Sequence, residues 1–187
     1  MRPNLPRRKP TRLRDYDYSQ PGAYFVTVCA QHRKCLFGAI VDEQMQLNAI
    51  SKIVVECWNR IPQHFPSVGL GESVIMPNHI HGIITCNPVG AGSPHPIENT
   101  SHRRGEVPSP AYRGSPSLGK IVAYFKYQST KYINQHRNTP GTRIWQRNYH
   151  DHIIRDDADL QRIHQYIQDN PMKWALDQLH PDNPSKW

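Results

Sequence analysis

The chain has 187 residues, enough to bury a hydrophobic core without disulfides or a structural metal, and we expect one domain with extensions. Its 23 Lys and Arg residues against 15 acidic residues give a net charge of +8, which favours a polyanionic partner. The four cysteines lack zinc-site spacing, no stretch approaches membrane-spanning length, and no apolar segment of a secretion signal follows the basic N-terminus. We therefore expect a cytoplasmic protein that is neither a cysteine-ligated zinc protein nor a membrane protein.

Residues 1–22 are rich in Arg, Lys and Pro and predict an extended basic arm. Within it, Arg7 and Arg8 are candidates for contacts with a phosphate backbone, although a solvated, partly disordered tail explains the same composition equally well. Residues 23–30 are dense in β-branched and aromatic side chains and follow a Pro-Gly pair, so they are predicted to form a central strand.

The next segments predict a helix and a hairpin. Apolar residues recur at helical spacing over residues 46–61, and Pro62 then breaks the pattern, which predicts an amphipathic helix. Residues 69–76 and 79–86 each have the composition of a strand and are joined by a Pro77-Asn78 turn. The two strands are expected to form an antiparallel hairpin.

Residues 87–116 are rich in Pro, Gly, Ser and Arg and show no periodicity, so we interpret them as a flexible insertion within the domain. Ser117 can cap a helix that follows. The apolar positions of this helix are Leu118, Ile121, Val122, Phe125 and Ile133. The same helix carries Lys120, Lys126 and Lys131 as candidate DNA contacts. Because Lys120 and Lys131 are close to three turns apart, they share a side that could face phosphate, and a solvated charged face is an equal alternative.

Residues 143–155 mix aromatic and basic side chains without a clear period. This mixture suits stacking on bases with cations near phosphates, and Arg147 and Arg155 are the candidate DNA contacts. An irregular core-packing segment explains the same residues equally well. A strand within residues 143–154 would complete an antiparallel sheet.

The last predicted element is a helix capped by Asp156 or Asp157, which should end at Asn170 because a proline follows. Its buried face is marked by Leu160, Ile163 and Ile167. The order of elements predicts an α+β fold in which helices pack on one face of an antiparallel sheet. We expect this domain to span residues 23–175, followed by a C-terminal tail of residues 176–187.

Two pairs of residues point to chemistry. His79 and His81 flank Ile80 in a predicted strand, so both imidazoles point to the same face. Tyr166 and Asn170 are four residues apart on the final helix and are neighbours on one of its faces. If that face covers the strand, two nitrogens and one oxygen would bind a divalent cation that polarises a scissile phosphate beside a tyrosine nucleophile.

Structural interpretations without catalysis remain open for both residue pairs. A His-x-His pattern in a chain with eleven histidines is weak evidence for a metal site, and a tyrosine on an amphipathic helix is more often a packing residue. Other tyrosines compete for the role of nucleophile, namely Tyr124, Tyr127, Tyr132 and Tyr149.

Four segments in the same order resemble a known family. They are Met-Pro-Asn-His-Ile-His-Gly-Ile at 76–83, Ile-Trp-Gln-Arg at 144–147, His-Ile-Ile-Arg at 152–155 and Tyr-Ile-Gln-Asp-Asn-Pro at 166–171. With them the chain resembles the single-tyrosine HUH transposases of the IS200/IS605 type, and more closely the transposases associated with repetitive extragenic palindromes (REP). The resemblance covers nearly the whole chain except the insertion.

The resemblance implies a ferredoxin-like sheet with His79 and His81 on a central strand as metal ligands. It further implies that Tyr166 is the nucleophile and Asn170 the third ligand. Family members cleave and rejoin single-stranded DNA at hairpins through a 5′-phosphotyrosine with Mg²⁺ or Mn²⁺, as monomers or homodimers. A non-catalytic hairpin-binding regulator and a replication-initiation nuclease with the same chemistry are the alternatives.

Overall fold

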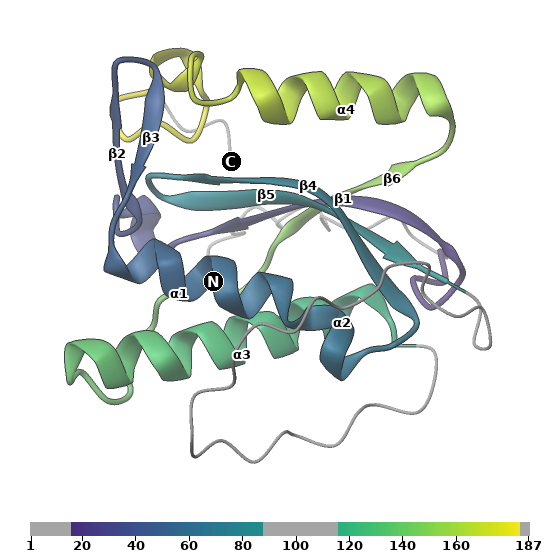
Figure 1. Cartoon of the computed structure of the whole chain (residues 1–187), viewed down its shortest axis with the longest axis horizontal. Coiled ribbons are helices and arrows are strands. Elements are labelled where there is room, and N and C mark those ends of the chain that lie inside the picture. The colour runs from purple at the N-terminus through teal and green to yellow at the C-terminus, as the bar shows by residue number, and fades with distance from the viewer. Residues whose placement is uncertain (1–15, 88–115, 184–187) are drawn as a thin grey trace, which may run out of the picture.

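A computed structural model describes residues 16–87 and 116–183. Its centre is a four-stranded antiparallel sheet in the order β4-β5-β1-β6 (Figure 1). The strands are β1 (Gly22–Cys29), β4 (Val68–Met76), β5 (His79–Cys86) and β6 (His150–Ile154). The α+β class, the antiparallel sheet, the hairpin and a late strand within 143–154 are therefore confirmed.

The strand that carries the two histidines lies inside the sheet. It pairs with β1 from Gly22 opposite Cys86 to Cys29 opposite His79, and β4 pairs along its other side. All its residues except Thr85 are buried, so both faces of the strand are covered. A buried central strand holds its side chains stiffly, which suits a site that needs fixed geometry.

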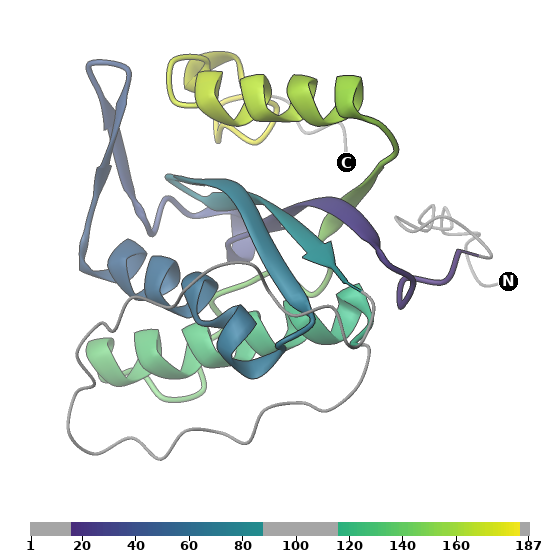
Figure 2. The same cartoon turned by 45° about the vertical axis from the view of Figure 1, so that its right-hand side comes forward.

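Helices cover both faces of the sheet rather than one (Figures 1 and 2). On one face lie α1 (Ala49–Asn59), α2 (Ile61–His64) and α3 (Leu118–Arg137). On the other face, α4 (Asp157–Asp169) packs through Ile163 and Ile167 against Ile83 of β5. The physical reason is the sequence of β5, which is apolar at positions facing both sides and would expose Ile83 without α4.

A second, two-stranded sheet precedes α1 and was not expected from the sequence. The strands β2 (Gly38–Val41) and β3 (Gln44–Leu47) form a hairpin, and Asn48 caps α1 through hydrogen bonds to its oxygen from the amides of residues 50 and 51. The helix predicted over 46–61 is therefore shorter, because its first residues belong to β3. Pro62 lies in the first turn of α2, where a missing N–H costs nothing.

The end of the described chain packs onto the sheet instead of trailing away. After α4, a 3-10 turn η2 (Trp174–Leu176) leads into residues 177–183, and Leu179 is buried. The side-chain amide of Asn78 donates to the Leu179 carbonyl at 2.8 Å. Residues 176–183, which the sequence analysis assigned to a tail, thus contact the turn beside the histidines.

Some sequence predictions concern residues outside the described ranges. Arg7 and Arg8 of the basic arm, and residues 88–115 of the insertion, lie there. Of the arm, Tyr16 and Tyr18 are described, and both pack against the hydrophobic core. In the described part of the chain, no helix is long and apolar enough to span a membrane.

Candidate metal centre and tyrosine site

The two histidines of β5 face α4 and meet at their ring tips. His79 and His81 are both buried, and their Nε2 atoms are 2.9 Å apart. Two nitrogens bound to one divalent ion at about 2.1 Å each would be separated by roughly 3 Å. The pair is therefore already spaced as two ligands of one ion.

A hydrogen bond from the turn sets the orientation of His79. The Asn78 side-chain amide donates to the carbonyl oxygens of Arg33 and Leu179, at 3.2 and 2.8 Å, which fixes which end of the side chain is oxygen. That oxygen lies 2.7 Å from His79 Nδ1 and can only accept, so Nδ1 carries the proton. The lone pair of His79 is then on Nε2, where it points at His81.

Thr27 of β1 orients the His81 ring in a similar way. Its hydroxyl lies 2.8 Å from His81 Nδ1, and both residues are buried. A hydroxyl can donate or accept, so Thr27 can accept from Nδ1–H when Nε2 binds a cation. Contacts of this kind fix the tautomer and the ring plane of metal-binding histidines.

Burial keeps both rings in the form that a metal ion needs. It lowers the pKa of His81 to about 3, with a smaller contribution from nearby His150. Burial also lowers the pKa of His79 well below its ordinary value, and the neighbouring His81 acts in the same direction. Both imidazoles are neutral at pH 7, and neutral imidazole is the ligand form.

A carboxylate that the sequence analysis missed completes this cluster. Asp177 follows η2, and its ligand atom lies within 4.8 Å of those of His79 and His81. Its Oδ2 is 3.9 Å from His79 Nε2, while its Oδ1 accepts from the Leu179 amide at 2.6 Å. Burial is the main influence on the Asp177 carboxyl and raises its pKa, as expected for an acid next to neutral rings.

Asn170, the third ligand implied by the family resemblance, lies at the end of α4. It is 4% exposed, and its side-chain oxygen has no hydrogen-bond partner among the described residues. A buried amide oxygen without a partner costs free energy unless something binds it. The neutral histidines, the Asp177 carboxylate and this oxygen are a donor set that fits a divalent cation.

Tyr166 lies next to the histidine pair on the adjoining turn of α4. Its hydroxyl is 3.3 Å from His81 Nε2, and its side chain remains 42% exposed. Its ring meets Phe25 edge-on, with the ring centres 5.8 Å apart. Burial raises the pKa of the phenol, and a hydrogen bond from Asn170 partly opposes that shift. At neutral pH the hydroxyl therefore keeps its proton unless a cation favours the phenolate.

The proposed DNA contacts fall into two groups. Lys120, Lys131, Arg147 and Arg155 are exposed. Lys126 instead donates to the backbone carbonyl oxygens of residues 146, 147 and 148, with the last two at 3.1 and 3.3 Å. Its ammonium group holds this loop against α3, and a direct contact with DNA would have to replace those bonds.

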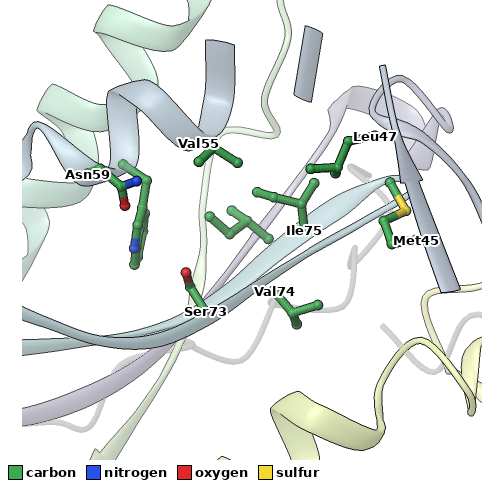
Figure 3. Close-up of a pocket in the computed structure, with 9 residues that line it drawn as sticks. Met45, Leu47, Val55, Asn59, Ser73, Val74 and Ile75 are labelled. Atoms are coloured by element: carbon green, nitrogen blue, oxygen red, sulfur yellow. The ribbon is translucent and has the colours of Figure 1, made fainter. Parts of the chain in front are cut away.

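The apolar pocket in Figure 3 lies elsewhere, between β3, α1 and the edge of β4. Its volume is about 320 Å³, and Met45, Leu47 and Val55 contribute to its lining. None of the residues of the histidine and tyrosine cluster lines it. The candidate site therefore lies between β5 and α4 and is separate from this cavity.

No protein-family model matches the chain, but individual proteins do. An uncharacterized protein of Haemophilus influenzae is 41% identical over 176 residues, which are 94% of each chain. A putative REP-associated tyrosine transposase of the same organism is 26% identical over 176 residues, 90% of this chain and 80% of its own. A solved REP-associated tyrosine transposase bound to a REP hairpin shares the fold, with a TM-score of 0.57 and 19% identity over 89% of this chain and 76% of its own.

The chain is similar in sequence to a putative REP-associated tyrosine transposase and shares its fold with a solved one. The resemblance found in the four sequence motifs is thus confirmed. Two of the matched proteins are described as REP-associated tyrosine transposases, which supports a transposase-type enzyme. The fold brings the Tyr166 hydroxyl and a possible metal site together.

Proposed function

We propose that this protein is a metal-dependent endonuclease and strand transferase for single-stranded DNA, with Tyr166 as its nucleophile. One observation carries the proposal: the Tyr166 hydroxyl lies 3.3 Å from His81 Nε2, which is itself 2.9 Å from His79 Nε2. A phenol, two neutral imidazoles and a carboxylate in one place have no evident role in packing alone. A regulator that only bound hairpins would need none of them.

His79, His81 and Asn170 are the proposed ligands of Mg²⁺ or Mn²⁺, and Asp177 is a further donor. A bound ion would supply Lewis-acid chemistry, offsetting negative charge on the scissile phosphate. Carboxylate and amide oxygens suit both ions, whereas the two imidazoles favour Mn²⁺ by ligand preference.

In the proposed reaction, the Tyr166 oxygen loses its proton and forms a bond to the phosphorus of the scissile phosphodiester. The bond from phosphorus to the 3′ oxygen of the preceding nucleotide breaks, and that oxygen leaves as a hydroxyl after taking up a proton. One DNA end is then a 5′-phosphotyrosine and the other a free 3′ hydroxyl. Because a phosphodiester replaces a phosphodiester, attack by a hydroxyl can rejoin strands without ATP.

Hairpin DNA is the proposed substrate, since the structural relative is bound to a REP hairpin. The exposed Lys120, Lys131, Arg147 and Arg155 are proposed phosphate contacts, together with Arg7 and Arg8 of the N-terminal arm. The excess of basic residues supports such a partner.

The deciding experiment detects a covalent protein–DNA adduct on a denaturing gel. Single-stranded palindromes from beside the gene are incubated with the protein and Mg²⁺ or Mn²⁺. We expect an adduct from wild type and from Tyr127→Phe, a matched control on an exposed residue of α3, and none from Tyr166→Phe. His79→Ala should also form none, because it removes a ligand.

Two outcomes would overturn the proposal. An adduct with Tyr166→Phe would assign the nucleophile to another residue. Shifted but uncut DNA with every variant, across several palindromes and both ions, would favour the hairpin-binding regulator.

A further inference from the structure

A second cavity lies at the other end of α3 from Ser117, where the chain leaving β1 meets the chain leaving the helix. Its volume is about 270 Å³. One wall is the 3-10 turn η1 (Gln31–Arg33) with the residues after it, and the other is the end of α3 with the loop that follows. The lining residues are Gln31, His32, Lys34, Leu36, Arg137, Thr142, Arg143 and Ile144.

This lining is strongly basic. Lys34, Arg137 and Arg143 carry permanent positive charges, and no acidic residue lines the cavity. None of the three forms an ion pair with any residue in the described ranges, whereas Arg162 on α4 and Lys173 just after it do pair with acids. Arg137 is favourably placed at the carboxyl end of a helix, but that explains neither Lys34 nor Arg143.

The walls of the cavity are held in place by backbone contacts. The Gln31 amide donates to the Ile144 carbonyl at 2.7 Å, and the Asn134 side chain donates to the Thr142 carbonyl at 2.9 Å. His32 and Arg33 adopt left-handed backbone conformations, with φ of 56° and 53°. Such conformations cost free energy in residues other than glycine and often occur at functional sites.

The same turn joins the cavity to the histidine and tyrosine cluster. The carbonyl of Arg33 accepts from the Asn78 side chain at 3.2 Å, and Asn78 also binds His79. The Arg33 guanidinium donates to the Gln178 carbonyl at 3.3 Å, next to Asp177. The turn η1 therefore lines the cavity on one side and contacts Asn78 and the segment after Asp177 on the other.

We propose that this cavity binds a backbone phosphate of the DNA strand that Tyr166 would cleave. Lys34, Arg137 and Arg143 would bind its oxygens, and Thr142 and Gln31 would add neutral donors. The inference rests on the proposed function, because its ligand is the strand that Tyr166 would cleave. This contact is with the DNA backbone and not with the bases, so binding at the cavity should not depend on the DNA sequence.

The test measures binding without cleavage, as fluorescence anisotropy of a labelled dT oligonucleotide in EDTA over a series of salt concentrations. Each phosphate contact with single-stranded DNA contributes about 0.7 to the slope of log affinity against log salt. Arg137→Gln with Arg143→Gln removes most of the positive charge around that one phosphate, so it should weaken binding and reduce the slope by about 0.7. The charge-preserving pair Arg137→Lys with Arg143→Lys should keep most of the slope.

Lys52→Gln is the matched control, because Lys52 is exposed on α1 and does not line the cavity. It should leave the slope at the wild-type value. Thermal unfolding of each variant checks that the fold is intact. An unchanged slope in the double Gln variant, or an equal loss in Lys52→Gln, would overturn the inference.

The outcome is separable from that of the proposed function. If wild type forms the adduct and the double Gln variant binds with an unchanged slope, the phosphate site is refuted and the proposed nuclease function is supported. If wild type forms no adduct but the slope falls as expected, the proposed nuclease function is refuted and the phosphate site is supported.

Discussion

Replacing Gly82 with alanine should destabilise the protein, because its strand lies directly against an indole ring. A Cβ atom at Gly82 would lie 2.9 Å from Cη2 and 3.1 Å from Cε2 of Trp58, with Cζ2 closer still. Carbon atoms in contact prefer about 3.5–4.0 Å. Trp58 is 2% exposed and packs edge-on against Phe125, and because its ring also borders the apolar pocket, a shift into that pocket would lower the cost of the new methyl group.

Overpacking of a well-packed core costs about 1–3 kcal/mol. In a domain of this size each kcal/mol lowers the Tm by about 2–4 °C, so Gly82→Ala should lower it by between about 2 and 12 °C. Trp58→Phe removes the ring atoms that the new methyl would meet. It breaks no hydrogen bond with the described residues, because the indole N–H has no partner among them.

The assay is a double-mutant cycle by urea unfolding of wild type, Gly82→Ala, Trp58→Phe and the double variant. We expect the double variant to be more stable than the sum of the two single effects predicts, by about 0.5–3 kcal/mol, the range for residues in contact. Strictly additive effects would refute the argument, because they would mean that the alanine methyl does not meet Trp58.

Two further predictions concern the polar contacts around the site. Thr27→Val should weaken Mn²⁺ binding by about 10–100-fold in calorimetry, because it removes the hydroxyl that orients His81, whereas Thr27→Ser should bind like wild type; equal affinity in all three would contradict the role of Thr27. Asp159 accepts from His152 at 2.8 Å, and that contact holds the pKa of the carboxyl below its ordinary value of 3.8. This stabilisation is therefore present above pH 3.8 and is lost as the pH falls through the lower pKa that Asp159 has in the folded protein. The free energy of unfolding of the wild type should drop in that pH range, and Asp159→Asn should make the drop smaller in an acid titration. An identical pH profile in the variant would contradict this prediction.

The elements with strong periodicity were predictable from the sequence. The strands at 22–29 and 79–86 and the helices α3 and α4 follow from composition, spacing and caps. The hairpin β2–β3 was missed because its turn is Asp42-Glu43, with φ of 49° and 61°, and not the Asn-Gly or Asp-Gly pair that usually marks such a turn.

The site was predictable only where its residues lie on regular elements. His79 and His81 share a face by strand geometry, and Tyr166 and Asn170 share one by helix geometry. Asp177 lies after a 3-10 turn with no periodicity, and only the fold brings it near the histidines. The roles assigned to these residues in catalysis stay predictions.

The contact between Asn78 and the Leu179 carbonyl joins residues 101 positions apart in the chain. A chain is synthesised from its N-terminus, so the hairpin that carries the histidines leaves the ribosome long before the segment that contains Asp177. Contacts of such high sequence separation also form slowly, because a long loop must close first. The donor set is therefore completed well after the histidine hairpin has been synthesised, and a nascent chain lacks the Asp177 carboxylate until the segment after α4 has been made.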